Sequence, residues 1–144
     1  MLEQGRGSCT TKHALLAELA REQGIEVQLT LGIYEMSERN TRGVGPVLSA
    51  YGLEYMLEAH CYRRCKGGRI DVTGVPAGAE PIACLFHEEP ITVDQLGAYK
   101  QNLHQRFLHE WISRMDFVRG RSLEDVWRIR EACIAALAAD CSAR

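Results

Sequence analysis

Cys9 is a cysteine whose neighbours favour a reactive thiolate. It follows a loop that contains Gly5 and Gly7, and an apolar pattern with helical spacing begins directly after it. Ser8 or Thr10 is a suitable N-cap, so we expect Cys9 in the first helical turn. Unpaired N–H groups and the helix dipole stabilise negative charge there, and cysteines so placed have pKa values of roughly 3.5–7.5, against about 8.5 for a free thiol. The alternative is that Cys9 is a small buried residue that happens to begin a helix.

His60 and Asp71 lie on either side of a turn signal, Lys66-Gly67-Gly68. In an antiparallel hairpin with an even-length loop, paired positions sum to an odd number, and His60 and Asp71 then share one face, one diagonal step apart. A loop of odd length, or a bulge, would put them on opposite faces. On one face, Asp71 can fix the imidazole tautomer of His60, as a Cys-His-Asp set requires for nucleophilic catalysis. The alternatives are that His60 is an ordinary strand residue and that Asp71 caps the turn.

The elements that must position these residues follow from hydrophobic periodicity. Four apolar positions predict one face of a first helix that ends at Gly24, namely Ala14, Leu15, Leu19 and Ala20. Residues 25–34 alternate, with every odd position apolar, which predicts a strand with one buried face. We expect a long loop over 35–46, a short helical turn over 47–51, and further strands over 55–63 and 69–73.

The C-terminal part of the chain is predicted to be helical. Apolar residues recur at helical spacing between about 92 and 117, and a second helix begins at Ser122, where Asp125 suits a capping box. Core packing explains the apolar faces of both helices. His104 and His109 are five residues apart and do not share a helical face, so we expect surface or hydrogen-bonded histidines rather than ligands.

The composition is that of one globular domain of 144 residues. We place its core at about 5–75 and its C-terminal helical part at about 91–140. A formal charge of −2 gives no reason to expect nucleic acid or a membrane as partner. The N-terminus shows no signal-peptide pattern, so we expect a cytoplasmic protein. Its six cysteines should then be free thiols or ligands. No CxxC pair occurs, and His60-Cys61 with Cys65 fits no common zinc spacing, so we expect neither a metal nor a cofactor.

The order of these motifs resembles the transglutaminase-like superfamily of cysteine enzymes. Gly7-Ser8-Cys9 followed by Lys12-His13-Ala14-Leu15-Leu16 and Gly24-Ile25 is similar to its nucleophile helix. Glu58-Ala59-His60-Cys61-Tyr62 is similar to its histidine strand, and Arg69-Ile70-Asp71-Val72-Thr73 to its aspartate strand. The resemblance covers about half of the chain. It implies an α+β fold with a papain-like core, in which an N-terminal nucleophile helix packs on a small antiparallel sheet, here followed by two C-terminal helices.

The resemblance also implies site residues, and the chain departs from the family in two places. Cys9, His60 and Asp71 match the catalytic positions. The family usually has an aromatic residue, often Trp, just after the histidine, where this chain has Cys61 and Tyr62. It also commonly has a helical segment before the nucleophile loop, and only eight residues precede Cys9 here. For the oxyanion hole we expect the backbone N–H of Cys9 and, by analogy with papain-like enzymes, Gln4.

Glu58 is predicted either to face the same cleft as His60 or to form a salt bridge with Arg64 or Arg69.

The expected function is acyl chemistry, with hydrolysis of an amide or peptide through a thioester on Cys9. The substrate would be a peptide, a protein or a small amide, and the family leaves open whether water or an amine accepts the acyl group. One alternative is acyl transfer of the arylamine N-acetyltransferase type, which also uses Cys-His-Asp, although the chain lacks that family's length and its Arg-Gly-Gly-x-Cys signature. The other is a catalytically inactive interaction scaffold, in which the C-terminal helices cover a homodimer interface. Those helices could equally close the core.

Overall fold

The computed structural model describes residues 8–72, 79–82 and 84–142 and shows an α+β fold with a four-stranded antiparallel sheet. The elements are α1 (Cys9–Glu22), β1 (Gln28–Ser37), α2 (Gly45–Ala50), β2 (Tyr55–Cys65), β3 (Gly68–Ile70), β4 (Leu85–Pro90), the 3-10 turn η1 (Val93–Leu96), α3 (Ala98–Arg114), the 3-10 turn η2 (Asp116–Val118) and α4 (Leu123–Ser142).

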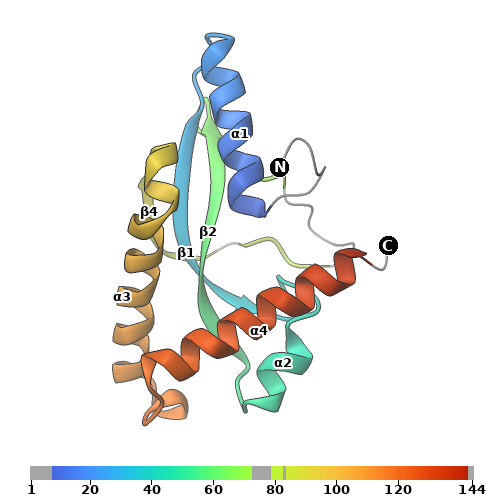
Figure 1. The fold of residues 1–144 in the computed structure, drawn as a ribbon, viewed down its shortest axis with the longest axis vertical. Coiled ribbons are helices and arrows are strands. Elements are labelled where there is room, and N and C mark those ends of the chain that lie inside the picture. Colours follow the sequence, from blue (N-terminus) through green and yellow to red (C-terminus); the bar gives the residue numbers. More distant parts are fainter. Residues whose placement is uncertain (1–7, 73–78, 83, 143–144) are drawn as a thin grey trace.

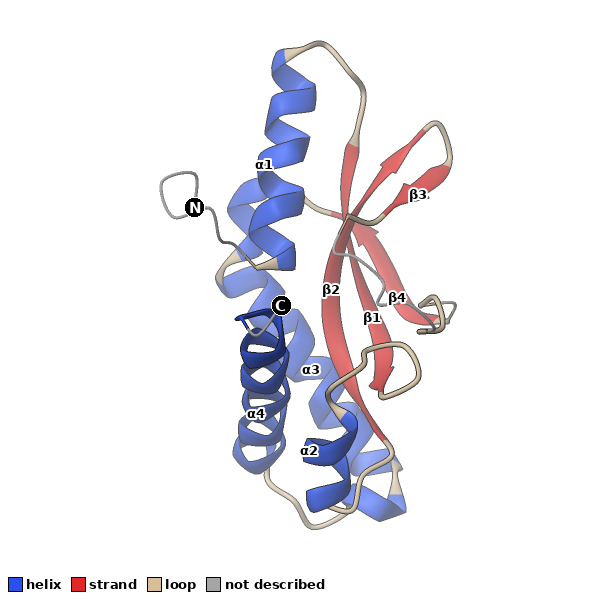
Figure 2. Ribbon diagram, turned by 90° about the vertical axis from the view of Figure 1, so that its right-hand side faces the viewer, coloured by secondary structure: helices blue, strands red, loops and turns tan. Residues whose placement is uncertain are grey.

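The sheet has the order β3-β2-β1-β4 and is built around the long β1–β2 pair. The pairing of β1 with β2 runs from Gln28 opposite Arg64 to Ser37 opposite Tyr55. Figure 1 shows α1 beside one end of this pair and α4 crossing near the other end. Figure 2 shows that α1, α3 and α4 form a helical layer on one side of the sheet.

Helix α1 begins where the sequence predicts. Ser8 is its N-cap and accepts a hydrogen bond from the backbone N–H of Thr11, and Gly24 follows its end with a φ of +68°. The buried face differs from the prediction, because Leu19 is 45% exposed, whereas His13, Ala14 and Ala17 are buried. The helix packs mainly on β2 through this face of small side chains and one histidine.

Strand β1 is longer and more deeply buried than predicted. It begins at Gln28 rather than Ile25 and continues to Ser37, into the expected loop. Residues 29–34 are all buried, so both faces of the strand are covered. The reason is its position between β2 and β4, with Leu85 and Tyr62 packed directly over Gly32. The alternation of apolar residues in the sequence predicted only one buried face, which is the more apolar of the two.

Strand β4 was not predicted from the sequence. Its side chains alternate between half-buried and exposed, but the half-buried positions include His87 and Glu89, whereas Phe86 and Pro90 are exposed. Because polar residues face inward, the strand lacks the apolar alternation by which strands are recognised.

The two C-terminal helices complete the core. The helix predicted over 92–117 is divided into η1, α3 and η2, and α4 begins with the predicted capping box, in which Ser122 and Asp125 exchange hydrogen bonds. Buried residues of these helices join Leu31, Ile33 and Met56 of the sheet in one cluster: Leu103, Leu108, Trp111, Val126, Ile129 and Cys133. Among the described residues, no helix is both long enough and apolar enough to cross a membrane.

Candidate functional site

The hairpin of β2 and β3 meets the condition on which the predicted contact depends. Arg63 pairs with Ile70 and Cys65 with Gly68, so the loop is the two-residue turn Lys66-Gly67. Both turn residues have positive φ, +48° and +79°, as a type I′ hairpin turn requires. The loop length is even, and Asp71, which follows β3 directly, therefore lies on the same face as His60.

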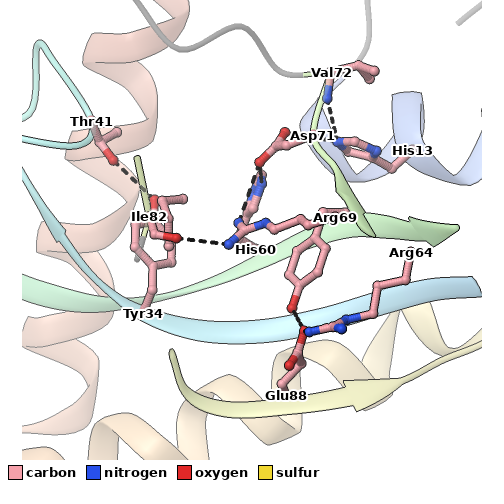
Figure 3. A network of polar contacts seen from close by, with 11 residues as sticks. His13, Tyr34, Thr41, His60, Arg64, Arg69, Asp71, Val72, Ile82 and Glu88 are labelled. Atoms are coloured by element: carbon pink, nitrogen blue, oxygen red, sulfur yellow. Dashed lines mark hydrogen bonds and ion pairs between the residues drawn. The ribbon is translucent and has the colours of Figure 1, made fainter. Parts of the chain in front are cut away.

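His60 and Asp71 are in direct contact, as the sequence predicts. The Nε2 atom of His60 lies 2.6 Å from Oδ2 of Asp71, and the His60 residue is only 9% exposed (Figure 3). A carboxylate at this distance accepts a hydrogen bond from Nε2–H and so favours the tautomer in which Nδ1 carries the lone pair. The ring is thereby prepared to accept or donate a proton at Nδ1.

His13 is a third member of the cluster that sequence reasoning missed. Its Nε2 atom lies 3.2 Å from Oδ1 of Asp71, and its ring is fully buried. The backbone N–H of Val72 is directed at the same Nε2 atom from 3.4 Å. The Asp71 carboxylate thus has one histidine on each oxygen, as Figure 3 shows. The sequence held one signal: His13 is four residues after Cys9, one turn along the same helix.

Two tyrosines flank His60, and Arg69 lies beside Asp71. The rings of Tyr34 and Tyr62 have their centroids 6.1 and 6.2 Å from that of His60. The Arg69 guanidinium lies over the Tyr62 ring at 4.0 Å, donates to the carbonyl of Ile82, and has Nη2 3.6 Å from Oδ2 of Asp71 (Figure 3). Arg69 therefore adds an ion pair to the Asp71 carboxylate and packs on the face of the Tyr62 ring.

Cys9 is the first residue of α1, so its predicted position in the first helical turn is confirmed. Its side chain lies outside the part of the chain that is described, as do Gln4, Gly5 and Gly7. The ammonium group of Lys100, from α3, donates to the hydroxyl of Thr10 at 2.7 Å. A positive charge therefore stands beside the first turn of α1, and it adds to the helix dipole in favouring an anion there.

Glu58 is paired with neither residue that the sequence suggested. Its carboxylate accepts two hydrogen bonds, both 2.8 Å, from Arg130 of α4. Burial by itself would raise the pKa of Glu58, but the hydrogen bonds from Arg130 and the nearby positive charges, that of Arg130 included, together outweigh it, so the pKa is lowered. Arg64 instead pairs with Glu88 at 2.6 Å. The pairing of Glu58 thus fixes α4 to β2, two residues from His60.

Among the described residues, further histidines and cysteines lie outside this cluster. His104 is buried and hydrogen-bonded through Nε2 to the carbonyl of Leu57, and His109 is exposed, so the prediction for both is confirmed. Cys65, Cys84 and Cys133 are free thiols, of which Cys133 is fully buried.

No known family profile matches the chain, and neither a curated protein nor a solved structure was found to be similar to it. The transglutaminase-like resemblance therefore rests on the sequence motifs alone.

Proposed function

We propose that this chain is a cysteine-dependent hydrolase of the transglutaminase-like type, with Cys9 as nucleophile, His60 as general base and acid, and Asp71 as the group that orients His60. The observation that carries the proposal is the 2.6 Å contact between His60 and Asp71. It joins a residue of β2 to the residue that follows β3, across a turn of the required length, and it leaves Nδ1 of His60 as the nitrogen for proton transfer. The start of a helix at Cys9, with Lys100 beside it, supports a thiolate.

The reaction would proceed in two halves. The Cys9 thiolate attacks the carbonyl carbon of an amide, and the electron pair of the C=O bond moves to oxygen, where the backbone N–H of Cys9 and the side chain of Gln4 would stabilise the oxyanion. As the C–N bond breaks, protonated His60 gives its proton to the leaving amine, and a thioester remains on Cys9. His60 then takes a proton from water, the resulting hydroxide attacks the thioester, and the released thiolate restores the starting state.

His13 is a positioning residue in this scheme. It binds the oxygen of Asp71 that His60 does not use, so the carboxylate is held at both ends. A carboxylate restrained in this way loses less orientational freedom when it steadies the imidazolium.

The test is alkylation with iodoacetamide between pH 5 and 9, with each thiol followed by peptide mass mapping. We expect Cys9 to be labelled below neutral pH, where the exposed Cys84 reacts slowly. Asp71→Asn should move the labelling profile of Cys9 to higher pH. The matched control is His87→Gln, because His87 contacts the carboxylate of Glu89 at 2.9 Å on β4, away from the cluster. It should leave the profile unchanged.

A second readout tests acyl transfer itself. Incubation with p-nitrophenyl acetate should release nitrophenol in a burst and leave one acetyl group on the peptide that contains Cys9, and Cys9→Ala should abolish both. If Cys9 instead reacts with the same pH profile as Cys84 and takes up no acetyl group, the proposal is wrong.

A further inference from the structure

The cluster of His13, His60 and Asp71 offers more than a catalytic triad uses. In a triad one histidine faces one carboxylate oxygen. Here two imidazoles from different elements direct Nε2 at the two oxygens of one carboxylate, at 3.2 and 2.6 Å. The three nearest ligand atoms all lie within 4.8 Å of one another. Two imidazole nitrogens and one carboxylate oxygen are a common ligand set for a divalent transition metal.

We propose that His13, His60 and Asp71 form a binding site for a Zn²⁺ ion, and that occupation of this site switches off the chemistry proposed for His60. Zinc is favoured over Mg²⁺ or Ca²⁺ because two of the three ligands are imidazole nitrogens, whereas those harder cations prefer oxygen.

The geometry needs only small side-chain adjustments to receive the ion. Zinc–nitrogen bonds are about 2.0–2.1 Å long, so ligand atoms in a tetrahedral site are roughly 3.3 Å apart. The contact of 3.2 Å, to Oδ1 of Asp71, is already close to this separation, and the contact of 2.6 Å, to Oδ2, is shorter by less than 1 Å. Because the two imidazoles face different oxygens and the ligand atoms lie within 4.8 Å of one another, the side chains must also rotate to bring both nitrogens around the ion. Three protein ligands leave a fourth position for water, as in zinc sites with an open coordination position.

The three ligands are held by separate parts of the fold. His13 lies on α1, His60 on β2, and Asp71 after the turn that ends at Gly68. Their positions therefore do not depend on the metal, and the site exists in the folded chain. Two features reduce the affinity relative to a structural zinc site. Arg69 brings a positive charge to 3.6 Å from Asp71, and Nδ1 of the buried His13 has no hydrogen-bond partner among the described residues.

Zinc binding and proton transfer by His60 exclude each other. To bind the metal through Nε2, His60 must lose the proton that it donates to Asp71, and the neutral ring then carries its proton on Nδ1. A ring with N–H at Nδ1 cannot accept the proton of a thiol there. The ion thus removes the base without any change in the backbone, and zinc would act as a reversible inhibitor.

The first measurement uses the unmodified chain. Long-range ¹H–¹⁵N spectra resolve the ring nitrogens of all five histidines, and Zn²⁺ is added stepwise to saturation with the thiols kept reduced. We expect the ring nitrogens of His13 and His60 to shift together, and those of His87, His104 and His109 to keep their positions. If neither His13 nor His60 responds at saturating Zn²⁺, the proposal is wrong.

A variant series then assigns the affinity. Competition with a chromogenic chelator gives the zinc dissociation constant of the unmodified chain, His13→Gln and the control His87→Gln. Loss of groups that only orient ligands typically costs about 10–100-fold in affinity, so loss of the ligand His13 should weaken binding at least tenfold. The control should bind as the unmodified chain does. Equal affinity in all three chains would place the metal elsewhere, for example on the exposed thiol of Cys84, and would overturn the proposal.

Both readouts are independent of catalysis. A chain that binds Zn²⁺ at His13 and His60 but shows no activated Cys9 would support the metal site and refute the proposed function. A chain with an activated Cys9 that does not bind Zn²⁺ at His13 and His60 would support the proposed function and refute the metal site.

Discussion

Replacing Arg130 by methionine should strongly destabilise the protein, because it leaves a buried carboxylate without its partner. Glu58 is 6% exposed and receives both of its 2.8 Å hydrogen bonds from Arg130. Removing one partner of a buried ion pair typically costs about 3–5 kcal/mol. The Arg130 side chain is 21% exposed and so is not fully desolvated. We therefore expect the lower end of that range, about 3 kcal/mol at pH 7.

The cost should depend on pH with a definite sign. In the unmodified chain the pKa of Glu58 is lowered below its usual 4.5, so the stability that Glu58 contributes is present above pH 4.5 and is lost as the pH falls through the folded-state value. Without Arg130, burial dominates and raises the pKa, so protonation then favours the folded state. The difference in stability between the two chains should therefore be largest at pH 7 and should shrink as the pH falls to 4.

The assay is urea unfolding at pH 7, 5 and 4, with two controls. Arg128→Met removes an arginine from the same helix that makes only exposed ion pairs with Glu124 and Asp125, and it should cost less than about 1 kcal/mol at every pH. The double variant Glu58→Gln/Arg130→Met removes both charges and should recover much of the loss. A cost for Arg130→Met of less than about 1 kcal/mol, or one that does not change between pH 7 and 4, would refute the reasoning.

Three further outcomes are expected. Burial lowers the pKa of His104 below its usual 6.5, so the stability linked to His104 is lost as the pH falls below 6.5. In His104→Gln, the urea concentration at the unfolding midpoint should therefore change less between pH 7.5 and 5.5 than in the unmodified chain. An equal change in both chains would contradict this. Burial raises the pKa of the Cys133 thiol to about 11, so at pH 8 iodoacetamide should label Cys84 in the folded protein and Cys133 only after unfolding, as mass mapping would show. Ser122→Ala removes the hydrogen bond to the backbone N–H of Asp125 and should lower the free energy of unfolding by about 1 kcal/mol in urea titration, whereas a neutral result would show that the cap is not needed.

Local signals in the sequence were sufficient to predict helix ends and turns, where the residue type at one or two positions decides the backbone conformation. Ser8 and Gly24 mark the ends of α1, and Lys66-Gly67 marks the turn, because caps and type I′ turns depend on the side chain or glycine at one or two positions. The contact of His60 with Asp71 was predicted on the condition that the hairpin loop has an even length, and the structure meets that condition with its two-residue turn.

Local sequence signals did not predict which distant elements contact one another. Nothing in the spacing of Glu58 and Arg130 indicates that α4 crosses β2, since an ion pair carries no periodicity. His13 stands in a helix whose apolar residues suggested a different buried face, so its contact with Asp71 was missed. Strand β4 was missed for a related reason, because His87 and Glu89 occupy its inner positions and interrupt the apolar pattern.

The contact between His60 and Asp71 depends on whether the number of residues in the turn Lys66-Gly67 is even or odd. Successive strand residues face opposite ways, so one extra residue in this turn would reverse every later position and send the Asp71 carboxylate to the far side of the sheet from His60. A second extra residue would bring it back. In any descendant of this chain that keeps the two side chains together, insertions and deletions within the hairpin should therefore occur in even numbers.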